Sequence, residues 1–337
     1  MKANNGKKRK KNIKILFVGN RNSSFIKNDY RLLQKNFDVK PISMSCLSLT
    51  TYLLKAFFLV KWADVVFCWF ASIESFFPLL FAKLFKKKSI VVAGGYDCAN
   101  EPEMDYGSFT NFREKIAAEY VFKNANVVLA VSKFVKKQTL EKITPKQLKI
   151  IYNGVNIKKF ESKKTKDKII VTIGQATQYK YKIKGLETFA RASAHFPDYK
   201  FVIIGQKDEC IYNKLKGINE NLVFTGKIPH DRVLKWLQKA RVYCQLSYIE
   251  SFGLGLAEAM SCNCIPVVTD RGSLSEIVGD AGFYVSYEDE KGTVEAIKRA
   301  LETSDQLGEK ARKRILKLFN FEKRERDLTN FVEAFLS

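Results

Sequence analysis

Two carboxylates lie on either side of a glycine-rich turn in the segment 248–282. Glu250 follows a predicted strand that ends near Ser247, and a predicted helix opens at the run 252–255 and carries Glu258 one to two turns inside. Glycines let the backbone approach a ligand closely, and the amides at a helix start favour a diphosphate. Carboxylates accept hydrogen bonds from sugar hydroxyls without a metal. The segment predicts a site for a sugar diphosphate, although this spacing also suits Glu258 as a solvated helix residue.

The same segment resembles the donor-site signature of the retaining family-4 glycosyltransferases, which have the two-lobed GT-B fold. The resemblance implies that Glu250 meets the transferred sugar as a catalytic residue and that Glu258 binds the ribose hydroxyls. It also implies that the backbone of Ser251, Phe252, Gly253 and Leu254 faces sugar and phosphate. The matching stretches are Glu250-Ser-Phe-Gly-Leu, Glu258-Ala-Met, Pro266-Val-Val, Gly272-Ser-Leu-Ser-Glu276 and Gly279-Asp-Ala-Gly282.

Three further stretches match the family in the expected order, at 151–160, 173–189 and 221–229. In the first, Asn156 replaces the usual aspartate, and a plain Asn-Gly turn is the alternative. In the third, the backbone near Ile228 is expected to contact the nucleobase.

The second stretch contains the cation on which the expected chemistry depends. Gly174 ends a predicted strand, and Lys184 matches the family lysine that clamps the diphosphate, so we assign it to catalysis and to donor binding. Gly205, at the end of the predicted strand 200–205, completes the expected donor side.

This stretch also departs from the family pattern. Gln175 stands where an arginine commonly follows the glycine, and the loop before Lys184 is long. A leaving diphosphate needs cationic or amide stabilisation as charge builds on it. We expect Lys180 or Lys182 to supply the missing charge near the donor, with an exposed loop lysine as the alternative for either.

The acceptor side is expected in the first half of the chain. Gly19 and Asn20 end the first strand, where the family places a glycine loop. Gly95, Tyr96 and Asp97 follow a buried strand where many relatives carry a polar pair facing the reaction centre. Asp97 is predicted to contact acceptor or transferred sugar, and a structural turn residue is the alternative.

Neither a metal nor a cofactor is expected. No Asp-x-Asp stands in a metal-binding context, and Lys184 with the helix amides would neutralise the phosphates in place of a divalent ion. The resemblance implies a metal-independent hexosyltransferase that retains anomeric configuration. It also favours a UDP-sugar over a GDP- or ADP-sugar, while sugar, base and acceptor are left open.

The pattern of predicted elements places these residues on two α/β lobes. Short apolar runs alternate with helical patterns, which is typical of parallel βαβ units. In the first half, strands are expected at 13–18, 63–70, 89–95 and 125–132, and helices from about 26 and at 50–61, 73–86, 109–123 and 133–142. In the second half, strands are expected at 168–174, 200–205, 221–226, 241–247, 264–270 and 282–286.

The chain length of 337 residues suits two units of about 150 residues each. We expect two doubly wound Rossmann-like domains facing each other across a cleft, with a last helix that crosses back to the first lobe. The apolar stripe Phe321, Leu328, Phe331, Val332 and Phe335 is predicted to pack there. The expected divisions are a basic tail at 1–12, an acceptor domain at 13–157, a donor domain at 158–320 and the last helix at 321–337. The charged run 158–168 is expected to be an exposed connection.

The net charge of +23 is distributed unevenly. Residues 1–160 hold 29 basic and 11 acidic residues, and residues 161–337 hold 29 and 24. The excess attracts an anionic partner. Basic runs at 7–11, 83–88 and 133–137 suggest an anionic membrane surface and a lipid-linked or glycan acceptor, with a merely solubilising surface as the alternative.

The cysteine and leader patterns favour a cytoplasmic location, at most peripheral on a membrane. Seven cysteines without framework spacing indicate reduced thiols, and Cys262 and Cys264 with two histidines in the chain make a zinc site improbable. The first apolar stretch is too short for a signal peptide. Charged residues interrupt the hydrophobic region 53–85, so no transmembrane helix is expected there.

Other function classes fit less well. No nucleic-acid-binding pattern accompanies the basic runs, so nucleic acid is not expected as a partner. The turn at 19–24 lacks the Gly-x-Gly-x-x-Gly of a nicotinamide oxidoreductase. An epimerase-like GT-B enzyme and a non-catalytic binder of sugar nucleotides remain as alternatives.

Overall fold

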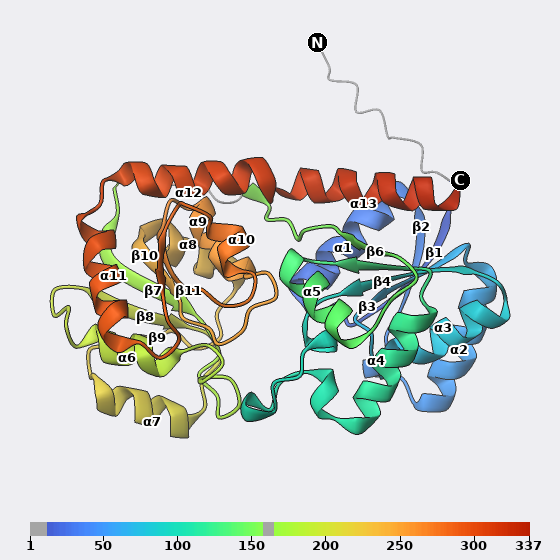
Figure 1. Cartoon of the computed structure of the whole chain (residues 1–337), viewed down its shortest axis with the longest axis horizontal. Helices are drawn as coiled ribbons and strands as arrows, with labels where there is room; N and C mark the ends of the chain where they lie inside the picture. Colours follow the sequence, from blue (N-terminus) through green and yellow to red (C-terminus); the bar gives the residue numbers. More distant parts are fainter. Residues whose placement is uncertain (1–11, 158–164) are drawn as a thin grey trace, which may run out of the picture. The chain divides into compact units, whose positions relative to one another are not determined.

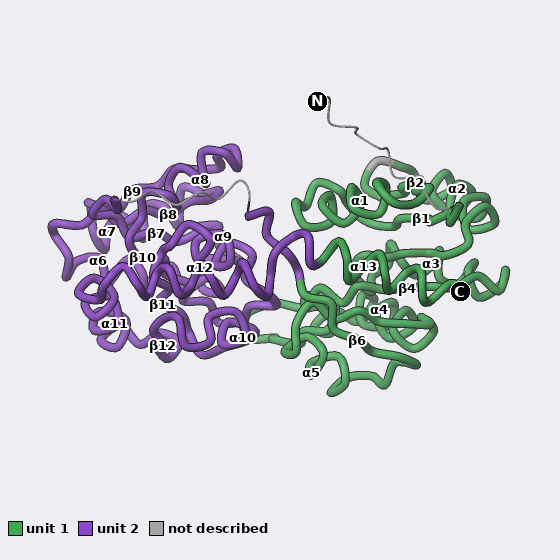
Figure 2. Tube along the Cα trace, turned by 90° about the horizontal axis from the view of Figure 1, so that it is seen from above, with its two compact units in different colours: residues 1–152, 324–337 green, residues 153–323 purple. Residues whose placement is uncertain are grey.

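The computed structural model describes residues 12–157 and 165–337, drawn in Figure 1. The chain forms two compact units (Figure 2). Unit 1 comprises residues up to Tyr152 together with Arg324–Ser337, and unit 2 comprises Asn153–Lys323. The chain therefore passes from one unit to the other twice.

Unit 1 contains a six-stranded sheet in the order β2-β1-β3-β4-β5-β6, and every pair of neighbouring strands is parallel. β3 and β5 are buried along their whole length, as expected of parallel strands covered on both faces. The strands are β1 (Lys14–Val18), β2 (Asp38–Ile42), β3 (Val65–Trp69), β4 (Lys88–Ala93), β5 (Val127–Ala130) and β6 (Leu148–Ile150).

The edge strand β2 was not predicted from the sequence. Its segment, Asp-Val-Lys-Pro-Ile, alternates polar and apolar residues and contains Pro41. Proline and charge are features of edge strands, which pair on one side only. With β2 in place, the order reverses between β1 and β3, so the sheet is doubly wound in the flavodoxin-like manner.

Five α-helices connect these strands. α2, α3 and α4 pack side by side (Figure 1). α4 begins later than its predicted start at 109 because Ser108–Thr110 forms a separate 3₁₀ turn and the Asn111 side chain caps the helix by accepting from the amides of Arg113 and Glu114. The helices are α1 (Ser24–Asn36), α2 (Leu49–Trp62), α3 (Ile73–Leu84), α4 (Phe112–Asn124) and α5 (Lys133–Lys142).

Unit 2 contains a second all-parallel sheet in which all six predicted runs take part, in the order β12-β11-β10-β7-β8-β9. The strands follow one another outward in both directions from the β7–β10 pair, which is the Rossmann order. The strands are β7 (Asp167–Ile173), β8 (Lys200–Ile204), β9 (Val223–Phe224), β10 (Ala240–Gln245), β11 (Ile265–Thr269) and β12 (Phe283–Val285).

Helices cover this sheet on both faces, and one face is closed by a core that includes Phe189 of α6 and Phe201 of β8, whose ring centroids lie 5.0 Å apart. The helices are α6 (Leu186–Ser193), α7 (Glu209–Ile218), α8 (His230–Lys239), α9 (Leu254–Ser261), α10 (Leu274–Val278), α11 (Glu290–Glu302) and α12 (Asp305–Leu318). The predicted two-domain α/β fold is confirmed.

The last helix, α13 (Phe321–Leu336), packs on unit 1 from Arg324 onward. Leu328 and Val332 of the predicted stripe are buried, and Phe331 and Phe335 are half-buried and stacked on one another. The buried side of α13 also includes Arg324, which lies between Phe321 and Leu328 along the helix and which the apolar pattern did not include.

Part of the predicted linker lies outside the described residues, namely 158–164, as does nearly all of the basic tail, 1–11. Asp167 and Lys168 of the predicted linker already belong to β7. Over the described ranges, no helix combines the length and the apolar character needed to cross a bilayer.

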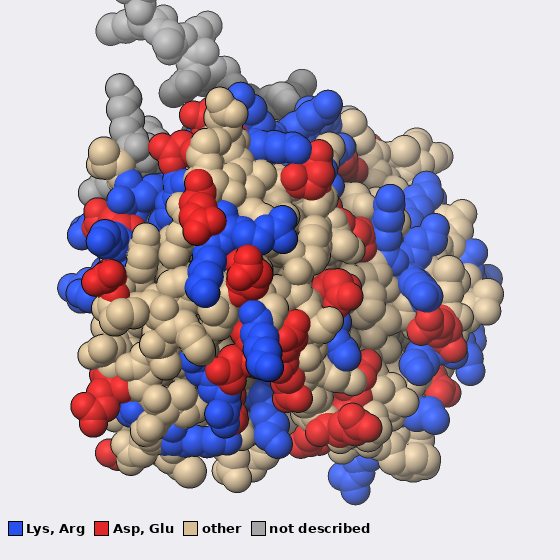
Figure 3. All heavy atoms as spheres, turned by 60° about the vertical axis from the view of Figure 1, so that its left-hand side comes forward, with Lys and Arg blue, Asp and Glu red and all other residues tan. Residues whose placement is uncertain are grey.

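Several charges in unit 2 form ion pairs. Glu187, for example, contacts both Arg191 of the same helix and Lys214 of α7. Figure 3 shows a face of the molecule on which basic and acidic side chains lie next to one another in this way.

Candidate active site

The predicted donor residues meet where β7 and β10 end. This is the point at which the strand order of unit 2 diverges, and open α/β sheets bind ligands outside the carboxyl ends of strands at such a point. The loops that leave the two strands touch, since the Tyr248 amide donates to the Ile183 carbonyl at 2.8 Å. A Cβ at Gly185 would lie 2.0 Å from the Leu246 carbonyl oxygen, so this contact requires glycine.

Glycine also allows the second close approach on this side of the sheet. A Cβ at Gly205 would lie 2.2 Å from the Gly174 carbonyl oxygen. The two predicted glycines therefore bring the ends of β7 and β8 together beneath the loop that carries Lys184.

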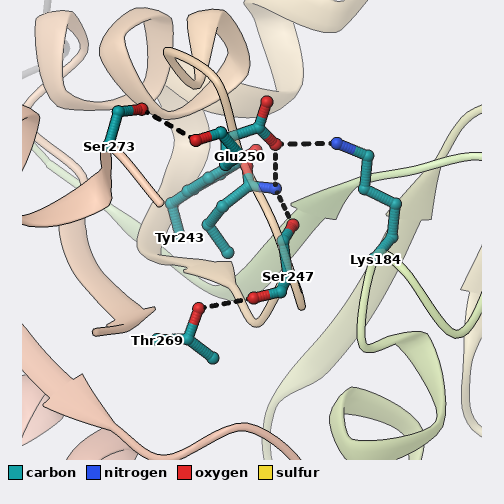
Figure 4. Close-up of polar contacts among 7 residues, drawn as sticks. Lys184, Tyr243, Ser247, Glu250, Thr269 and Ser273 are labelled. Atoms are coloured by element: carbon teal, nitrogen blue, oxygen red, sulfur yellow. Dashed lines mark hydrogen bonds and ion pairs between the residues drawn. The ribbon is translucent and has the colours of Figure 1, made fainter. Parts of the chain in front are cut away.

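Lys184 and Glu250 form an ion pair at this position, with 2.7 Å between Nζ and Oε2 (Figure 4). Their side chains keep 28% and 17% of their surface exposed, so the pair is partly shielded yet reachable. The two residues are 66 positions apart in the sequence, so their spacing does not show that they are in contact. They were predicted for one site only through the resemblance.

A buried polar chain supports Glu250 from below (Figure 4). The Tyr243 hydroxyl donates to Gln245 Oε1 at 2.7 Å, and Gln245 Nε2 lies 2.7 Å from Ser247 Oγ and 3.3 Å from Glu250 Oε2. The Gln245 amide is therefore fixed in one orientation and directs its N–H groups toward Ser247 and Glu250. Sequence reasoning missed Gln245 and Tyr243, because both lie inside a run that was predicted as an ordinary strand.

The backbone of Glu250 is held as firmly as its side chain. The Ser273 amide and hydroxyl both reach the Glu250 carbonyl, at 2.9 and 3.1 Å (Figure 4). Gly272 has φ +65°, and a Cβ there would lie 2.3 Å from the same oxygen. The stretch beginning at Gly272, quoted above as part of the signature, thus braces the loop of Glu250.

The start of α9 presents backbone rather than side chains. Its N-cap is Gly253, in the left-handed region at φ +80°, and no side chain caps the helix there. Phe252 is buried and packs edge-on against Phe319, so its ring belongs to the core. The amides of Leu254 and the next residues are orphan donors of a helix start, the kind of group that binds anions.

Glu258 has a partner that the sequence did not reveal. Its Oε1 lies 2.9 Å from Nε2 of His230, the first residue of α8. The Glu258 side chain is 19% exposed and that of His230 is 55% exposed. Ile228 is half-buried two residues before His230, so the expected nucleobase and ribose contacts lie on one side of unit 2.

The loop after β7 carries both cations predicted to substitute for the missing arginine. Gln175, Lys180 and Lys182 are all exposed in the loop after β7, and the Tyr287 hydroxyl donates to the Lys182 carbonyl at 2.8 Å. A further cation, Arg271, stacks over the rings of Tyr248 and Tyr287, with its guanidinium carbon 4.5 and 5.3 Å from their centroids.

Comparison with known proteins agrees with this geometry. The family described as "Glycosyl transferases group 1" matches residues 155–315, nearly the whole of unit 2. An uncharacterized glycosyltransferase of Methanocaldococcus jannaschii is 29% identical over 287 residues, 77% of this chain and 71% of that protein. Residues 155–315 thus match the group 1 glycosyltransferases, and the chain is similar to a glycosyltransferase over most of its length.

A GDP-mannose:cellobiosyl-diphosphopolyprenol alpha-mannosyltransferase of Xanthomonas oryzae is a more distant relative of this chain. It is 23% identical over 150 residues, 42% of this chain, and the chain spans only 40% of its length. Among solved structures, Anabaena HepE in complex with UDP-glucose has a TM-score of 0.77 at 16% identity, over 96% of this chain and 100% of that one. This likeness shows a shared GT-B fold.

The residues predicted for the acceptor side lie at strand ends in unit 1. Gly19 and Asn20 follow β1, and Asn20 Oδ1 accepts from the Asn22 amide at 3.0 Å. Gly95, Tyr96 and Asp97 follow β4. Tyr96 is 41% exposed and meets Tyr106 edge-on, so among these three residues it is the one whose side chain reaches solvent.

Asp97 is placed as a turn residue. It is 1% exposed, and its two oxygens accept from the backbone amides of Ala71, Gly94 and Gly95 at 2.8–3.0 Å. This geometry corresponds to the structural alternative and not to the predicted contact with a sugar, because the carboxylate is directed inward. Burial raises the pKa of Asp97 to about 6, against the opposing effect of these hydrogen bonds.

The Asp97→Asn variant is therefore expected to lose about 1–3 kcal/mol of folding stability, since its Nδ2 must face a backbone N–H group. In the wild type, the raised pKa means that the folded state holds this proton more tightly than the unfolded chain. The stability contributed by protonation is complete below the ordinary value of 3.8 and is lost as pH rises through about 6. Asparagine does not titrate, so the gap in melting temperature between wild type and variant should narrow from about pH 4.5 to about pH 7.5.

Asp105→Asn, at an exposed position of the neighbouring loop, is the control and should show a constant difference over this range. A gap for Asp97→Asn that widens with pH would contradict the assignment.

Among the residues that the structure describes, no cluster of three or more His, Cys, Asp or Glu side chains could hold a metal ion. The thiols are also poorly suited to ligation. Burial raises the pKa of Cys264 to about 11, and Cys262 beside it is shifted in the same direction by burial.

Proposed function

We propose that the chain is a glycosyltransferase that moves a hexose-type sugar from a nucleotide diphosphate sugar to a lipid-linked or glycan acceptor, with retention of anomeric configuration and without a metal ion. The observation that carries the proposal is the Lys184–Glu250 pair beside the uncapped start of α9, at the divergence point of a Rossmann-order sheet. A cation, a row of backbone N–H groups and an acceptor carboxylate are what a sugar diphosphate requires.

Each group has a distinct task in the proposed reaction. Lys184 and the α9 amides bind the diphosphate and stabilise the charge that grows on it as the glycosidic bond breaks. Glu250 binds the transferred sugar, and Glu258 binds the ribose. The acceptor attacks from the face that the diphosphate leaves, and the departing phosphate takes the acceptor proton.

The Lys184–Glu250 pair also has an electrostatic role of its own. Lys184 neutralises Glu250 at 2.7 Å, so neither charge is left alone in a partly shielded position. When the donor binds, Lys184 turns to the phosphates, and Gln245 remains as a hydrogen-bond donor to Glu250. The carboxylate is thereby freed for the sugar hydroxyls.

The donor and acceptor classes rest on different support. UDP-glucose in Anabaena HepE supports a UDP-sugar, which we favour over GDP- or ADP-sugars, while the Xanthomonas relative is named for GDP-mannose and a polyprenol-linked acceptor. The latter name and the basic character of residues 1–160 support a lipid-linked acceptor at the cytoplasmic face of a membrane.

The experiment that tests donor binding is a thermal-shift panel of UDP-, GDP- and ADP-sugars without added metal, on the wild type and on Glu258→Ala. A ligand at 100 times its Kd raises stability by about 2.7 kcal/mol. We expect a UDP-sugar to give a clear shift in the wild type and a much smaller one in Glu258→Ala, because the ribose contact is removed.

The matched control is Glu309→Ala, an exposed glutamate on α12 of the same unit, which should keep the full shift. An undiminished shift in Glu258→Ala would remove this residue from the ribose site. A wild type that responds to no nucleotide sugar would remove the proposed donor class.

A further inference from the structure

Unit 1 exposes an unusual concentration of large apolar side chains on three adjacent helices. Twelve large hydrophobic residues are exposed in the described part of the chain, and eight of them lie on α2, α3 and α4. Single exposed apolar residues are common, whereas contiguous groups mark a surface that meets another body. The eight, named here the apolar face, are Leu49, Leu54, Phe58, Ile73, Leu80, Leu84, Phe112 and Ile116.

α3 forms the middle of this face. Ile73, Leu80 and Leu84 are exposed and, with the half-buried Phe77, follow the spacing i, i+4, i+7, i+11, which is one stripe of a helix. The opposite side, including Leu79 and Ala82, is buried against the sheet. The outward stripe of α3 therefore contains no polar residue, although a surface helix normally carries its polar side there.

Neighbouring helices pack against both sides of α3, so the exposed stripe is not the surface by which α3 contacts them. On one side, Phe81 meets Phe57 of α2 with ring centroids 5.5 Å apart. On the other, Phe76 meets Tyr120 of α4 at 4.6 Å. The outward direction is the one left uncovered in the described chain.

α2 continues the face with a cationic border. Leu54 and Phe58 lie one turn apart, and they are 63% and 65% exposed. Lys55 is exposed beside them, and Lys61 lies over the rings of Phe57 and Phe85 at 5.1 and 5.3 Å. A lysine that covers a ring with its stem while its ammonium reaches outward is suited to a boundary between apolar and aqueous surroundings.

The charge of this region is one-sided. Residues 49–88 contain six lysines, at 55, 61, 83, 86, 87 and 88, and two acidic residues. Both acids are engaged with the backbone, since Glu74 accepts from the Met44 amide and Asp64 from the Lys14 amide. Around α2 and α3 the apolar face is thus bordered by positive charge with little acidic compensation, whereas α4 carries both signs of charge.

We propose that the apolar face docks on an anionic lipid bilayer. Apolar side chains enter the boundary between headgroups and acyl chains, and lysines at the border are attracted to the anionic surface. A second copy of this chain fits less well, because two such faces would bring like charges together. The docking deepens the proposed function, since it brings the enzyme to a lipid-linked acceptor, and it rests on that function for its purpose.

The test is sedimentation of the full chain with phosphatidylcholine vesicles, with and without about one third phosphatidylglycerol. The wild type should pellet with the anionic vesicles only. Leu54→Ser/Phe58→Ser should lower the partition coefficient about tenfold or more, because two exposed apolar side chains no longer enter the bilayer. Lys55→Glu/Lys86→Glu should lower it comparably, because two cations at the border of the face are replaced by anions.

Matched controls come from α5 of the same unit, which has one exposed large apolar residue, Leu140, among several lysines. Leu140→Ser and Lys137→Glu/Lys142→Glu should bind vesicles nearly as the wild type does. If the α5 charge variant loses binding as much as Lys55→Glu/Lys86→Glu, total charge and not this face governs binding, and the proposal fails.

Two other outcomes would also overturn the docking. The first is wild-type protein that stays in the supernatant with anionic vesicles. The second is a dimer in light scattering that Leu54→Ser/Phe58→Ser abolishes without vesicle binding, which would assign the face to a second copy. Unchanged melting temperatures exclude misfolding, and the donor thermal shift measured on the same variants separates a failure of docking from a failure of the proposed glycosyl transfer.

Discussion

Replacing Lys184 by alanine is expected to lower kcat by about a hundredfold to a thousandfold, the usual loss when one group that stabilises the developing charge is removed. Lys184 lies in the loop between β7 and α6, and its Nζ is 2.7 Å from Oε2 of Glu250. Its removal also leaves Glu250, the carboxylate that we propose binds the sugar, without its counter-charge. Turnover of a UDP-sugar, measured as release of nucleoside diphosphate with a lipid-linked acceptor, gives the result.

Glu250→Gln sharpens this prediction. The variant keeps the shape of the side chain, but it removes the negative charge that pairs with Lys184 and leaves one acceptor oxygen where Lys184 and Gln245 both donate to Oε2. We expect sugar selectivity and turnover to fall more than affinity for the bare nucleoside diphosphate. Equal losses for nucleoside diphosphate and donor would count against a contact between Glu250 and the sugar.

The same assay identifies the substitute for the missing arginine. Lys180→Ala and Lys182→Ala remove the two loop cations that precede Lys184, and Lys298→Ala removes an exposed lysine of α11 as a control. Replacing the lysine that assists the diphosphate should lower kcat more than Lys298→Ala does. Wild-type turnover in Lys184→Ala, with the enzyme folded, would remove that lysine from the mechanism.

The second large effect concerns stability. Asp29→Ala and Arg324→Ala are each expected to lower the free energy of unfolding by about 3–5 kcal/mol, because each leaves the partner's charge buried and uncompensated. Arg324 meets Asp29 with two hydrogen bonds, from Nε to Oδ1 at 2.6 Å and from Nη2 to Oδ2 at 2.5 Å. The two side chains are 4% and 1% exposed. Urea unfolding followed by tryptophan fluorescence reports the change, since Trp69 Nε1 donates to Asp29 at 2.9 Å.

A second ion pair between the same two helices provides the control. Lys35 and Glu325 join α1 to α13 at 2.7 Å, but the lysine side chain is 67% exposed. Lys35→Ala should therefore cost less than about 1 kcal/mol. If Arg324→Ala costs no more than Lys35→Ala, the buried pair does not anchor the helix.

The fold was largely predictable because most strands are continuous apolar runs and most helices carry a buried stripe. The failures have local causes. β2 escaped because an edge strand with Asp38, Lys40 and Pro41 has the composition of a loop. The start of α4 was placed too early because the cap depends on one side chain, Asn111, that can equally belong to a turn.

In the candidate site, only residues that belong to recognisable sequence motifs could be predicted. Glu250, Lys184 and the Gly253 turn were named from a resemblance, and whether they bind a donor stays a prediction. Gln245, His230 and Ser273 could not be found in this way, because their contacts depend on the β7–β10 arrangement and on residues 5 to 28 positions away. Asp97 shows the reverse case, since a polar residue after a strand can be directed toward a ligand or back into the turn.

The buried Arg324 sets a condition on how such chains can be recombined. Its Nη1 donates to the carbonyls of Ile151 and Tyr152, the last residues before the chain first leaves unit 1. The exit and the return of the polypeptide are thereby tied together by one guanidinium. If unit 2 is exchanged between related enzymes, the two chains must be joined at both of these places. The terminal helix must then come from the same enzyme as the rest of unit 1.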